Sequence, residues 1–225
     1  MNNSENGFQT EPDVPREHAA VSDVPPSPEA LAEAAELQVL GRDGKPHLFK
    51  SLYGGLDSTS RVVIVFIRHF YCGACQAYTE SVSTTMTPEI LSSSHMPTTF
   101  VFIGCGGHEL IDDYAQVTNC RYPIYTDPTG KLFDTLGMVR TMAAGGRTVY
   151  SPKRWLSHAI KGMYDLLVDL PSGKAMKSGD PMQVGGEFVF EECKGEKIVT
   201  WCHRMRNQRD HTEVADLCRV LGLDM

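Results

Sequence analysis

Residues 61–75 read Arg61-Val-Val-Ile-Val-Phe-Ile67 and then Arg68-His-Phe-Tyr-Cys72-Gly-Ala-Cys75. The continuous apolar run predicts a strand buried on both faces, because a strand with one face in water alternates apolar and polar side chains. A helical pattern starts at about Ala74 and continues to about Met86, where Pro88 follows. The sequence therefore predicts a buried strand that leads into two cysteines on the first turn of a helix.

Two cysteines at this spacing and in this place indicate thiol redox chemistry. The unpaired N–H groups at a helix N-terminus and the helix dipole both favour a thiolate. Such cysteines have pKa values of roughly 3.5–7.5, against about 8.5 for a free cysteine. We expect Cys72 and Cys75 to be catalytic and to act without a bound cofactor. Cys72 is the more N-terminal of the two, as the attacking thiol of an oxidoreductase would be.

Composition sets limits on the class of protein. The 225 residues suffice for one sizeable domain, and no apolar run approaches the roughly 18 residues of a membrane span. Residues 1–37 hold eight acidic residues and one arginine, which accounts for the whole net charge of −7. The rest of the chain has no basic excess for phosphates, so we expect neither nucleic acid nor a membrane as partner.

The seven cysteines show no framework spacing, and the N-terminus lacks the pattern of a secretory leader. Both features predict reduced thiols and a cytoplasmic protein. Residues 1–26 are acidic, rich in proline and poor in large apolar residues, so we expect a disordered acidic tail. Residues 27–225 are expected to form a single domain.

The pattern along that domain predicts an α/β fold. Helices are expected at 28–37, 74–86, 106–117, 127–136, 152–170 and 212–221, and strands at 38–40, 47–52, 61–67, 98–104, 122–125, 187–191 and 197–201. Pro123 suggests that strand 122–125 lies at an edge of the sheet. Crossover helices come first and a hairpin comes last, which predicts a mixed central sheet with helices on both faces and an insertion before the C-terminal hairpin.

The chain resembles the peroxiredoxin-like AhpC/TSA-type antioxidant-domain family of the thioredoxin superfamily over roughly residues 35–224. The resemblance rests on Arg68–Cys75, Tyr125–Pro128, Leu136–Met138, Gly179–Gly186, His203-Arg204 and Asp210-His211. It implies a thioredoxin-like fold and a thiol-dependent oxidoreductase or peroxidase acting on a small-molecule substrate. It further implies thioredoxin or glutathione as the reductant, and a homodimer as one assembly to test.

Two positions depart from the patterns of this superfamily. Gly185-Gly186 stands where thioredoxins and many relatives carry a cis-proline that faces the active cysteine. Cys72 stands where typical peroxiredoxins carry a threonine, so that Cys75 takes the position of their peroxidatic cysteine. The oxidoreductase and peroxiredoxin patterns thus name different nucleophiles, and the sequence leaves both open.

Other residues are candidates for the substrate site. Arg68 and His69 precede the cysteine pair, where a cation favours a thiolate or binds an anionic oxygen; the alternatives are a solvated strand end and a packed histidine. Arg140 would add a second cation to the pocket. Gly185 and Gly186 would let backbone approach a ligand closely, unless they form only a local bulge or turn.

Three further interpretations remain. Cys105, at the end of strand 98–104, is a candidate resolving thiol at a distance. A zinc site would need Cys105 or Cys202-His203 to complete a ligand set with the Cys72/Cys75 pair, and their spacing does not match a zinc finger, so we expect no metal. Finally, the same fold serves other functions: a lyase, isomerase or cyclase that acts on a metabolite in a pocket shaped by residues 138–180, or a binding module.

Overall fold

The computed structural model describes residues 21–54, 60–92, 94–146 and 173–223. Its strands are β1 (Gln38–Leu40), β2 (Pro46–Leu48), β3 (Arg61–Phe66), β4 (Thr98–Gly104), β5 (Ile124–Thr126), β6 (Gly186–Cys193) and β7 (Glu196–Arg204). Its helices are α1 (Pro28–Ala35), α2 (Ser51–Gly54), α3 (Gly73–Thr85), α4 (Pro88–Ser92), α5 (Ile111–Thr118), α6 (Lys131–Thr135) and α8 (Val214–Leu221), with 3₁₀ turns at His108–Leu110 and Lys174–Lys177.

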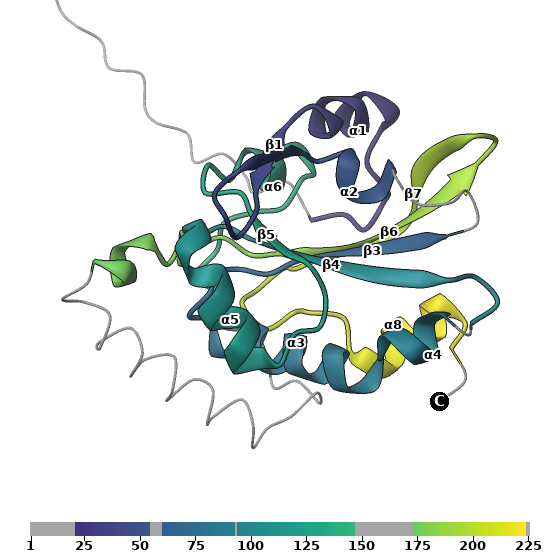
Figure 1. The fold of residues 1–225 in the computed structure, drawn as a ribbon. Helices are drawn as coiled ribbons and strands as arrows, with labels where there is room; N and C mark the ends of the chain where they lie inside the picture. Colours follow the sequence, from purple (N-terminus) through teal and green to yellow (C-terminus); the bar gives the residue numbers. More distant parts are fainter. Residues whose placement is uncertain (1–20, 55–59, 93, 147–172, 224–225) are drawn as a thin grey trace, which may run out of the picture.

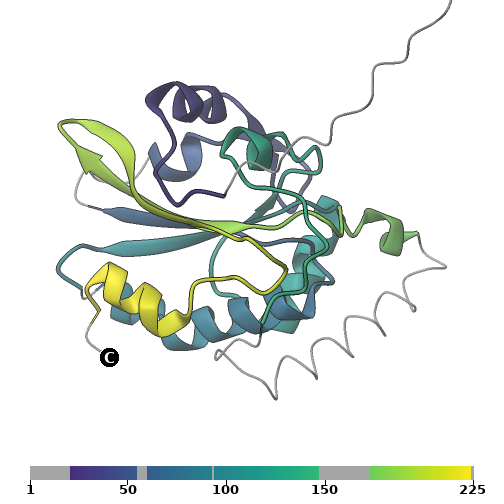
Figure 2. The same cartoon turned by 180° about the vertical axis from the view of Figure 1, so that it is seen from behind.

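The strands form one seven-stranded mixed sheet in the order β2-β1-β5-β4-β3-β6-β7. The central strands β3, β4 and β5 are parallel to one another, and β6 runs antiparallel to β3. The sheet separates α1, α2 and α6 from α3, α4, α5 and α8 (Figure 1, and seen from behind in Figure 2). This arrangement confirms the predicted α/β fold with a mixed central sheet and helices on both faces. The expected helix at 152–170 lies outside the described residues.

Strand β3 supplies both hydrophobic layers, as its continuous apolar sequence predicts. Val62, Ile64 and Phe66 belong to the core under α1, α2 and α6. Val63 and Val65 belong to the core that packs against α3, α5 and α8. All five side chains are fully buried, because successive residues of a strand point to opposite faces.

Strand β5 lies inside the sheet, so the prediction of an edge position for residues 122–125 is wrong. The strand begins at Ile124, after Pro123, and lies between β1 and β4. Pro123 has no N–H to donate, but its carbonyl accepts a hydrogen bond from Phe102 N at 2.9 Å. A proline just before a strand therefore costs no sheet hydrogen bond.

The second strand is shorter than expected, since residues 51–54 form helix α2. The chain leaves the strand pattern at Phe49, whose N–H bonds Leu37 O at 2.8 Å. The Phe49 ring is buried and packs edge-on against Tyr53 and Phe190. Burial of this aromatic ring explains why β2 ends at Leu48.

The described chain begins with contacts to the end of β7. Asp23 Oδ1 accepts a hydrogen bond from Arg204 N at 2.9 Å, and Asp23 Oδ2 pairs with Arg206. The buried Arg204 guanidinium donates to the carbonyl oxygens of Ser22 and Val24. Residues 22–24, part of the segment expected to be a tail, are therefore held against the domain, whereas residues 1–20 lie outside the described part.

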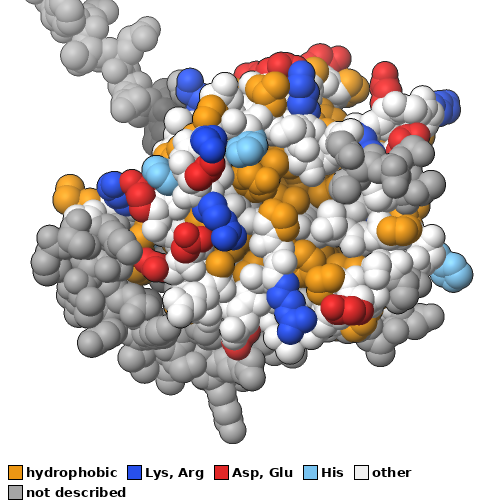
Figure 3. All heavy atoms as spheres, in the orientation of Figure 1, with side chains coloured by type: hydrophobic (Ala, Val, Ile, Leu, Met, Phe, Trp, Pro, Cys, Tyr) orange, Lys and Arg blue, Asp and Glu red, His pale blue; other side chains and the backbone are white. Residues whose placement is uncertain are grey.

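The surface is mixed in charge on the face seen in Figure 3, where basic and acidic side chains alternate around apolar ones. Within the described residues, no helix has the length and apolar character needed to cross a membrane.

Candidate active site

The cysteine pair lies where β3 leads into α3. Cys72 is the N-cap residue of α3 with extended backbone angles, and its carbonyl accepts from Gln76 N at 2.9 Å. Cys75 lies in the first turn of the helix. Cys72 is 5% exposed and Cys75 is fully buried. The predicted placement of two thiols at the start of a helix after a buried strand is confirmed, and Cys72 is the more accessible of the two.

Arg68 connects the pair to the loop before β6. Its guanidinium donates to Cys72 Sγ at 3.2 Å, to Pro181 O at 2.6 Å and to Gln183 O at 3.2 Å. The side chain is buried, with 5% exposed, so it is not a solvated strand end. A cation held by two carbonyls against a sulfur stabilises the thiolate form of that sulfur.

The two thiols differ in ionisation. A hydrogen bond from the Cys75 thiol holds the pKa of Cys72 well below that of a free cysteine although burial opposes this, and the neighbouring His69 and Arg68 lower this pKa further. Burial, and the hydrogen bond that the Cys75 thiol donates to Cys72, raise the pKa of Cys75 well above the ordinary value. Of the two thiols, Cys72 is thus the one that ionises more readily.

Behind Cys75 lie two buried polar residues that the sequence analysis did not single out as site residues. Cys75 Sγ is 3.4 Å from His211 Nε2, and His211 Nδ1 is 2.6 Å from Glu187 Oε1. The side chains of His211 and Glu187 are fully buried. Glu187 Oε2 also accepts from Thr212 Oγ1 at 3.0 Å.

The sheet places Glu187 beneath the cysteine pair. Glu187 is paired in register with Val65 of β3, so both side chains point to the layer that contains α3. The His211 ring stacks on Tyr78 of α3, with centroids 4.3 Å apart and planes 4° apart. An acidic residue that begins an apolar strand was the available sequence signal, since a carboxylate in such a place needs a partner.

His69 lies next to the pair without a bond to either sulfur among the contacts of the described residues. Its carbonyl accepts from Cys72 N at 3.0 Å, while its Nδ1 is buried with no hydrogen-bond partner in the described part of the chain. Burial lowers the pKa of His69. Burial therefore favours the neutral form of this ring near Cys72.

Gly185 and Gly186 lie where β6 approaches the ends of its neighbours. A Cβ on Gly185 would be 1.7 Å from Phe66 O, and one on Gly186 would be 2.5 Å from His203 O. Backbone contacts within the sheet therefore require glycine at both positions. Among the described residues no peptide bond is cis. A contact between either glycine and a substrate stays a prediction.

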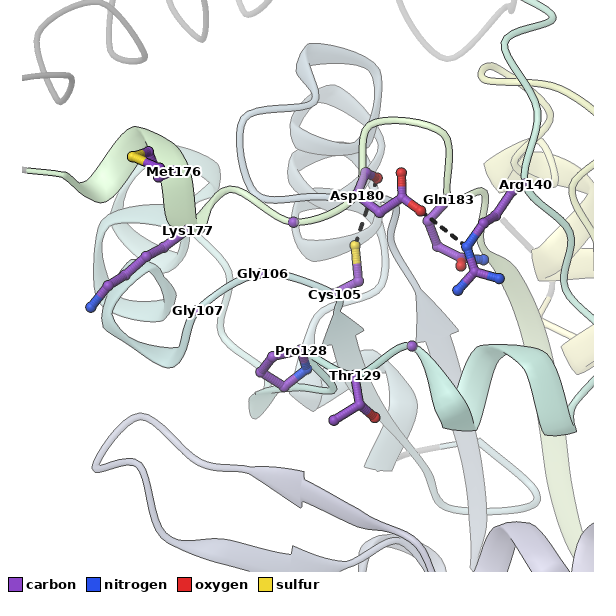
Figure 4. Close-up of a pocket in the computed structure, with 12 residues that line it drawn as sticks. Cys105, Gly106, Gly107, Pro128, Thr129, Arg140, Met176, Lys177, Asp180 and Gln183 are labelled. Carbon is purple, nitrogen blue, oxygen red and sulfur yellow. Dashed lines mark hydrogen bonds and ion pairs between the residues drawn. The ribbon is translucent and has the colours of Figure 1, made fainter.

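Arg140 lies apart from the cysteine pair, in a pocket of about 390 Å³. It forms an ion pair with Asp134 at 2.6 Å. It forms another with Asp180 at 3.0 Å, which Figure 4 marks. Cys105 lines the same pocket, and its thiol donates to Arg68 O at 2.8 Å. Burial raises the pKa of Cys105 to about 12. This pocket and the cysteine pair share the 180–183 loop, whose carbonyls hold Arg68.

Within the described ranges, no group of three or more histidine, cysteine, aspartate or glutamate side chains is arranged to hold a metal ion.

The model of the AhpC/TSA antioxidant enzyme family matches residues 84–207. This is more than half of the chain, and it includes β4, β6 and β7. The match begins at residue 84, which follows both cysteines in the sequence, so it assigns no role to Cys72 or Cys75.

Relatives and solved structures extend the comparison. Peroxiredoxin-like 2C of Bos taurus is 28% identical over 213 residues, covering 92% of this chain and 87% of that protein. Its counterpart in Homo sapiens is 28% identical over 203 residues, covering 88% and 84%.

The structure of the bacterioferritin comigratory protein of Xanthomonas campestris aligns with this chain with a TM-score of 0.53 at 10% identity. That structure was determined to study the alkyl peroxide reduction activity of the bacterial protein. The alignment covers 89% of this chain and 94% of that one. Peroxiredoxin Q of the same organism gives 0.52 at 10% identity, with 88% and 93% covered. These likenesses confirm the predicted thioredoxin-like fold.

Proposed function

Because this chain belongs to the AhpC/TSA antioxidant enzyme family, we propose that it reduces a small-molecule peroxide through a dithiol–disulfide cycle of Cys72 and Cys75. The observation that carries the proposal is the environment of Cys72. Its sulfur lies at the N-terminus of α3, 3.2 Å from a buried guanidinium, and accepts a hydrogen bond from the Cys75 thiol. Each of these interactions favours a thiolate nucleophile.

The chemistry follows from this difference between the thiols. The Cys72 thiolate attacks one oxygen of the peroxide, the O–O bond breaks, and the alkoxide leaves as an alcohol after taking a proton. Cys72 is then a sulfenic acid. Cys75, as a thiolate, attacks the Cys72 sulfur and expels hydroxide, which becomes water. The product is a Cys72–Cys75 disulfide, with two electrons passed from the two thiols to the peroxide.

The disulfide has to be reduced for turnover. A dithiol protein of the thioredoxin type, or two molecules of glutathione, would supply the two electrons by thiol–disulfide exchange. Cys72 is the sulfur such a reductant would attack, because Cys75 is fully buried. Attack on Cys72 expels Cys75, which takes up a proton, and leaves a mixed disulfide between the reductant and Cys72. A second thiol of the reductant then attacks the reductant's sulfur in that disulfide and releases Cys72 as a thiolate, whose low pKa makes it a good leaving group.

The test is turnover of hydrogen peroxide and of an organic hydroperoxide, with thioredoxin plus its reductase or with glutathione. Cys72→Ser is expected to abolish peroxide consumption, and Cys75→Ser to permit a single turnover that stops at the sulfenic acid. Cys193→Ser, on an exposed thiol at the end of β6, is the matched control and should keep full activity. Peroxide turnover that persists in the Cys72→Ser, Cys75→Ser double variant would refute the proposal.

A second candidate function is supported by the pocket beside the pair. A lyase, isomerase or cyclase would bind a metabolite in the 390 Å³ pocket that Arg140, Gln183 and Lys177 line. Figure 4 shows the Arg140 guanidinium directed into this pocket, while Lys177 points away from it. In this case the double cysteine variant would keep metabolite conversion, and Arg140→Gln would lose it.

A further inference from the structure

A proton acceptor for Cys75 is missing from the cycle described above. Cys75 must lose its proton before it attacks the oxidised Cys72, yet burial disfavours its thiolate. Arg68 N, which bonds Cys75 Sγ at 3.4 Å, is a donor and cannot take a proton. The fully buried position of Cys75 leaves no solvent access for an external base.

Among the contacts of the described residues, the acceptors for the Cys75 proton are Cys72 Sγ and His211 Nε2. In the reduced protein the proton is shared with the Cys72 thiolate. Once Cys72 has become a sulfenic acid, its sulfur no longer carries the negative charge that attracted the proton. The remaining acceptor is His211 Nε2, 3.4 Å from Cys75 Sγ.

The geometry around His211 suits the tautomer that this step needs. Its Nδ1 lies 2.6 Å from Glu187 Oε1, and with the ring proton on Nδ1 and donated to this carboxylate, Nε2 has a free lone pair toward Cys75. The stack on Tyr78 fixes the plane of the ring, and Thr212 fixes the carboxylate. A nucleophile, a base and a group that orients the base form the arrangement used to activate buried nucleophiles.

We propose that His211 is the catalytic base for Cys75 and that Glu187 positions it, so that the pair drives closure of the Cys72–Cys75 disulfide. His211 takes the proton of Cys75, the Cys75 thiolate attacks Cys72 Sγ, and the S–O bond of the sulfenic acid breaks. The hydroxide that leaves receives the proton back from His211 as water, so the base is regenerated without another reactant. This inference rests on the proposed peroxide cycle and adds the residues for its second step.

The test separates the two chemical steps in the full-length protein. Reduced protein is mixed with an organic hydroperoxide in the presence of dimedone, which traps sulfenic acids, and the products are mapped by mass spectrometry. His211→Gln should slow disulfide closure about 100-fold or more relative to the formation of the sulfenic acid in the same sample, because general base catalysis contributes a factor of this size. Dimedone adducts at Cys72 should accumulate accordingly.

Glu187→Gln and a control complete the set of variants. Glu187→Gln keeps the shape of the carboxylate but not its charge, and it should slow closure less than His211→Gln does. His108→Gln, on the partly exposed histidine before α5 that pairs with Glu109 at 3.6 Å, is the matched control and should close the disulfide at the wild-type rate.

The pH profile distinguishes a base from a merely structural residue. The ionisable groups that face His211 and Glu187 are Cys75 and Tyr78 of α3 and His203 of β7. In His211→Gln, Cys75 must ionise without help, so closure should speed up about tenfold per pH unit between about pH 7 and pH 9. Wild-type closure should be nearly flat there. A purely structural role would lower the rate equally at every pH.

Each outcome decides the inference. Closure in His211→Gln at the wild-type rate, or a tenfold rise per pH unit in the wild-type protein itself, would overturn it, and the second result needs no variant to fold. If wild-type protein formed neither a sulfenic acid nor a disulfide, the proposed peroxide cycle would fail first, and this inference with it. Normal sulfenic acid formation with slow, pH-dependent closure in His211→Gln alone would support both.

Discussion

Replacing Arg68 by methionine tests the claim that a buried guanidinium activates Cys72. Methionine keeps most of the length of the side chain but removes the charge and all three hydrogen bonds, to Cys72 Sγ, Pro181 O and Gln183 O. A hydrogen bond to a charged group contributes about 1.5–3 kcal/mol. At about 1.4 kcal/mol per pKa unit, the loss should raise the pKa of Cys72 by roughly one to two units.

The assay is the rate of iodoacetamide alkylation at Cys72 as a function of pH, with each cysteine mapped by mass spectrometry. Arg68→Met should move the midpoint of the Cys72 profile upward by that amount. Cys105, whose pKa burial raises to about 12, serves as the unreactive internal reference in the folded protein. The variant should also lose about 1–3 kcal/mol of stability for each buried carbonyl left without a donor, so folding is checked by circular dichroism first.

Arg61→Met is the matched control for this experiment. Arg61 lies at the other end of the same strand, where it pairs with Glu191 at 2.5 Å and donates to Leu221 O at 2.8 Å. The same change in charge there should leave the Cys72 profile in place. A folded Arg68→Met protein with an unshifted profile would refute the assignment of Arg68 as the group that activates Cys72.

The remaining predictions concern stability. Gly185→Ala should destabilise the fold by about 3 kcal/mol or more in urea unfolding, because the new methyl group would lie 1.7 Å from Phe66 O; a change under about 1 kcal/mol would contradict the close approach. Phe66→Ala should cost about 3–5 kcal/mol, since its ring packs on Phe133 and Phe188; a smaller loss would mean that the core collapses around the cavity. Although partial burial opposes this, hydrogen bonds from Arg204 N and Arg206 lower the pKa of Asp23. The free energy of unfolding of the wild-type protein should therefore exceed that of Asp23→Asn by at most about 1 kcal/mol at pH 7, and the difference should disappear as the pH falls below about 4. A difference in stability that grew in acid would contradict this prediction.

The sequence predicted the central elements of the fold because their signals are local. Strands β3 and β4 are continuous apolar runs, and only burial on both faces accommodates them. The position of β5 was not predictable in the same way. Pro123 indicates a strand at the edge of the sheet only if the proline lies inside the strand, where its missing N–H would interrupt the hydrogen bonds to the neighbouring strand. Whether it lies inside depends on the residue at which β5 starts.

The same distinction holds for the candidate site. Cys72, Cys75 and Arg68 lie within eight residues of one another, so one strand and one helix start bring them together. His211 and Cys75 are 136 residues apart, and Glu187 reaches them through its register with β3. Contacts between distant segments leave no periodic pattern in the sequence. Arg140 was predicted in the substrate site from its neighbours, and the fold gives it two carboxylate partners in the adjacent pocket.

The most direct test of the central claim is the site of oxidation in the two single cysteine variants. Each reduced variant is treated with one equivalent of an organic hydroperoxide, and sulfenic acids are trapped with dimedone and mapped. We predict an adduct at Cys72 in Cys75→Ser, no adduct at Cys75 in Cys72→Ser, and a Cys72–Cys75 disulfide in the wild-type protein. An adduct at Cys75 in Cys72→Ser, formed as fast as wild type consumes peroxide, would contradict the assignment of Cys72 as the nucleophile.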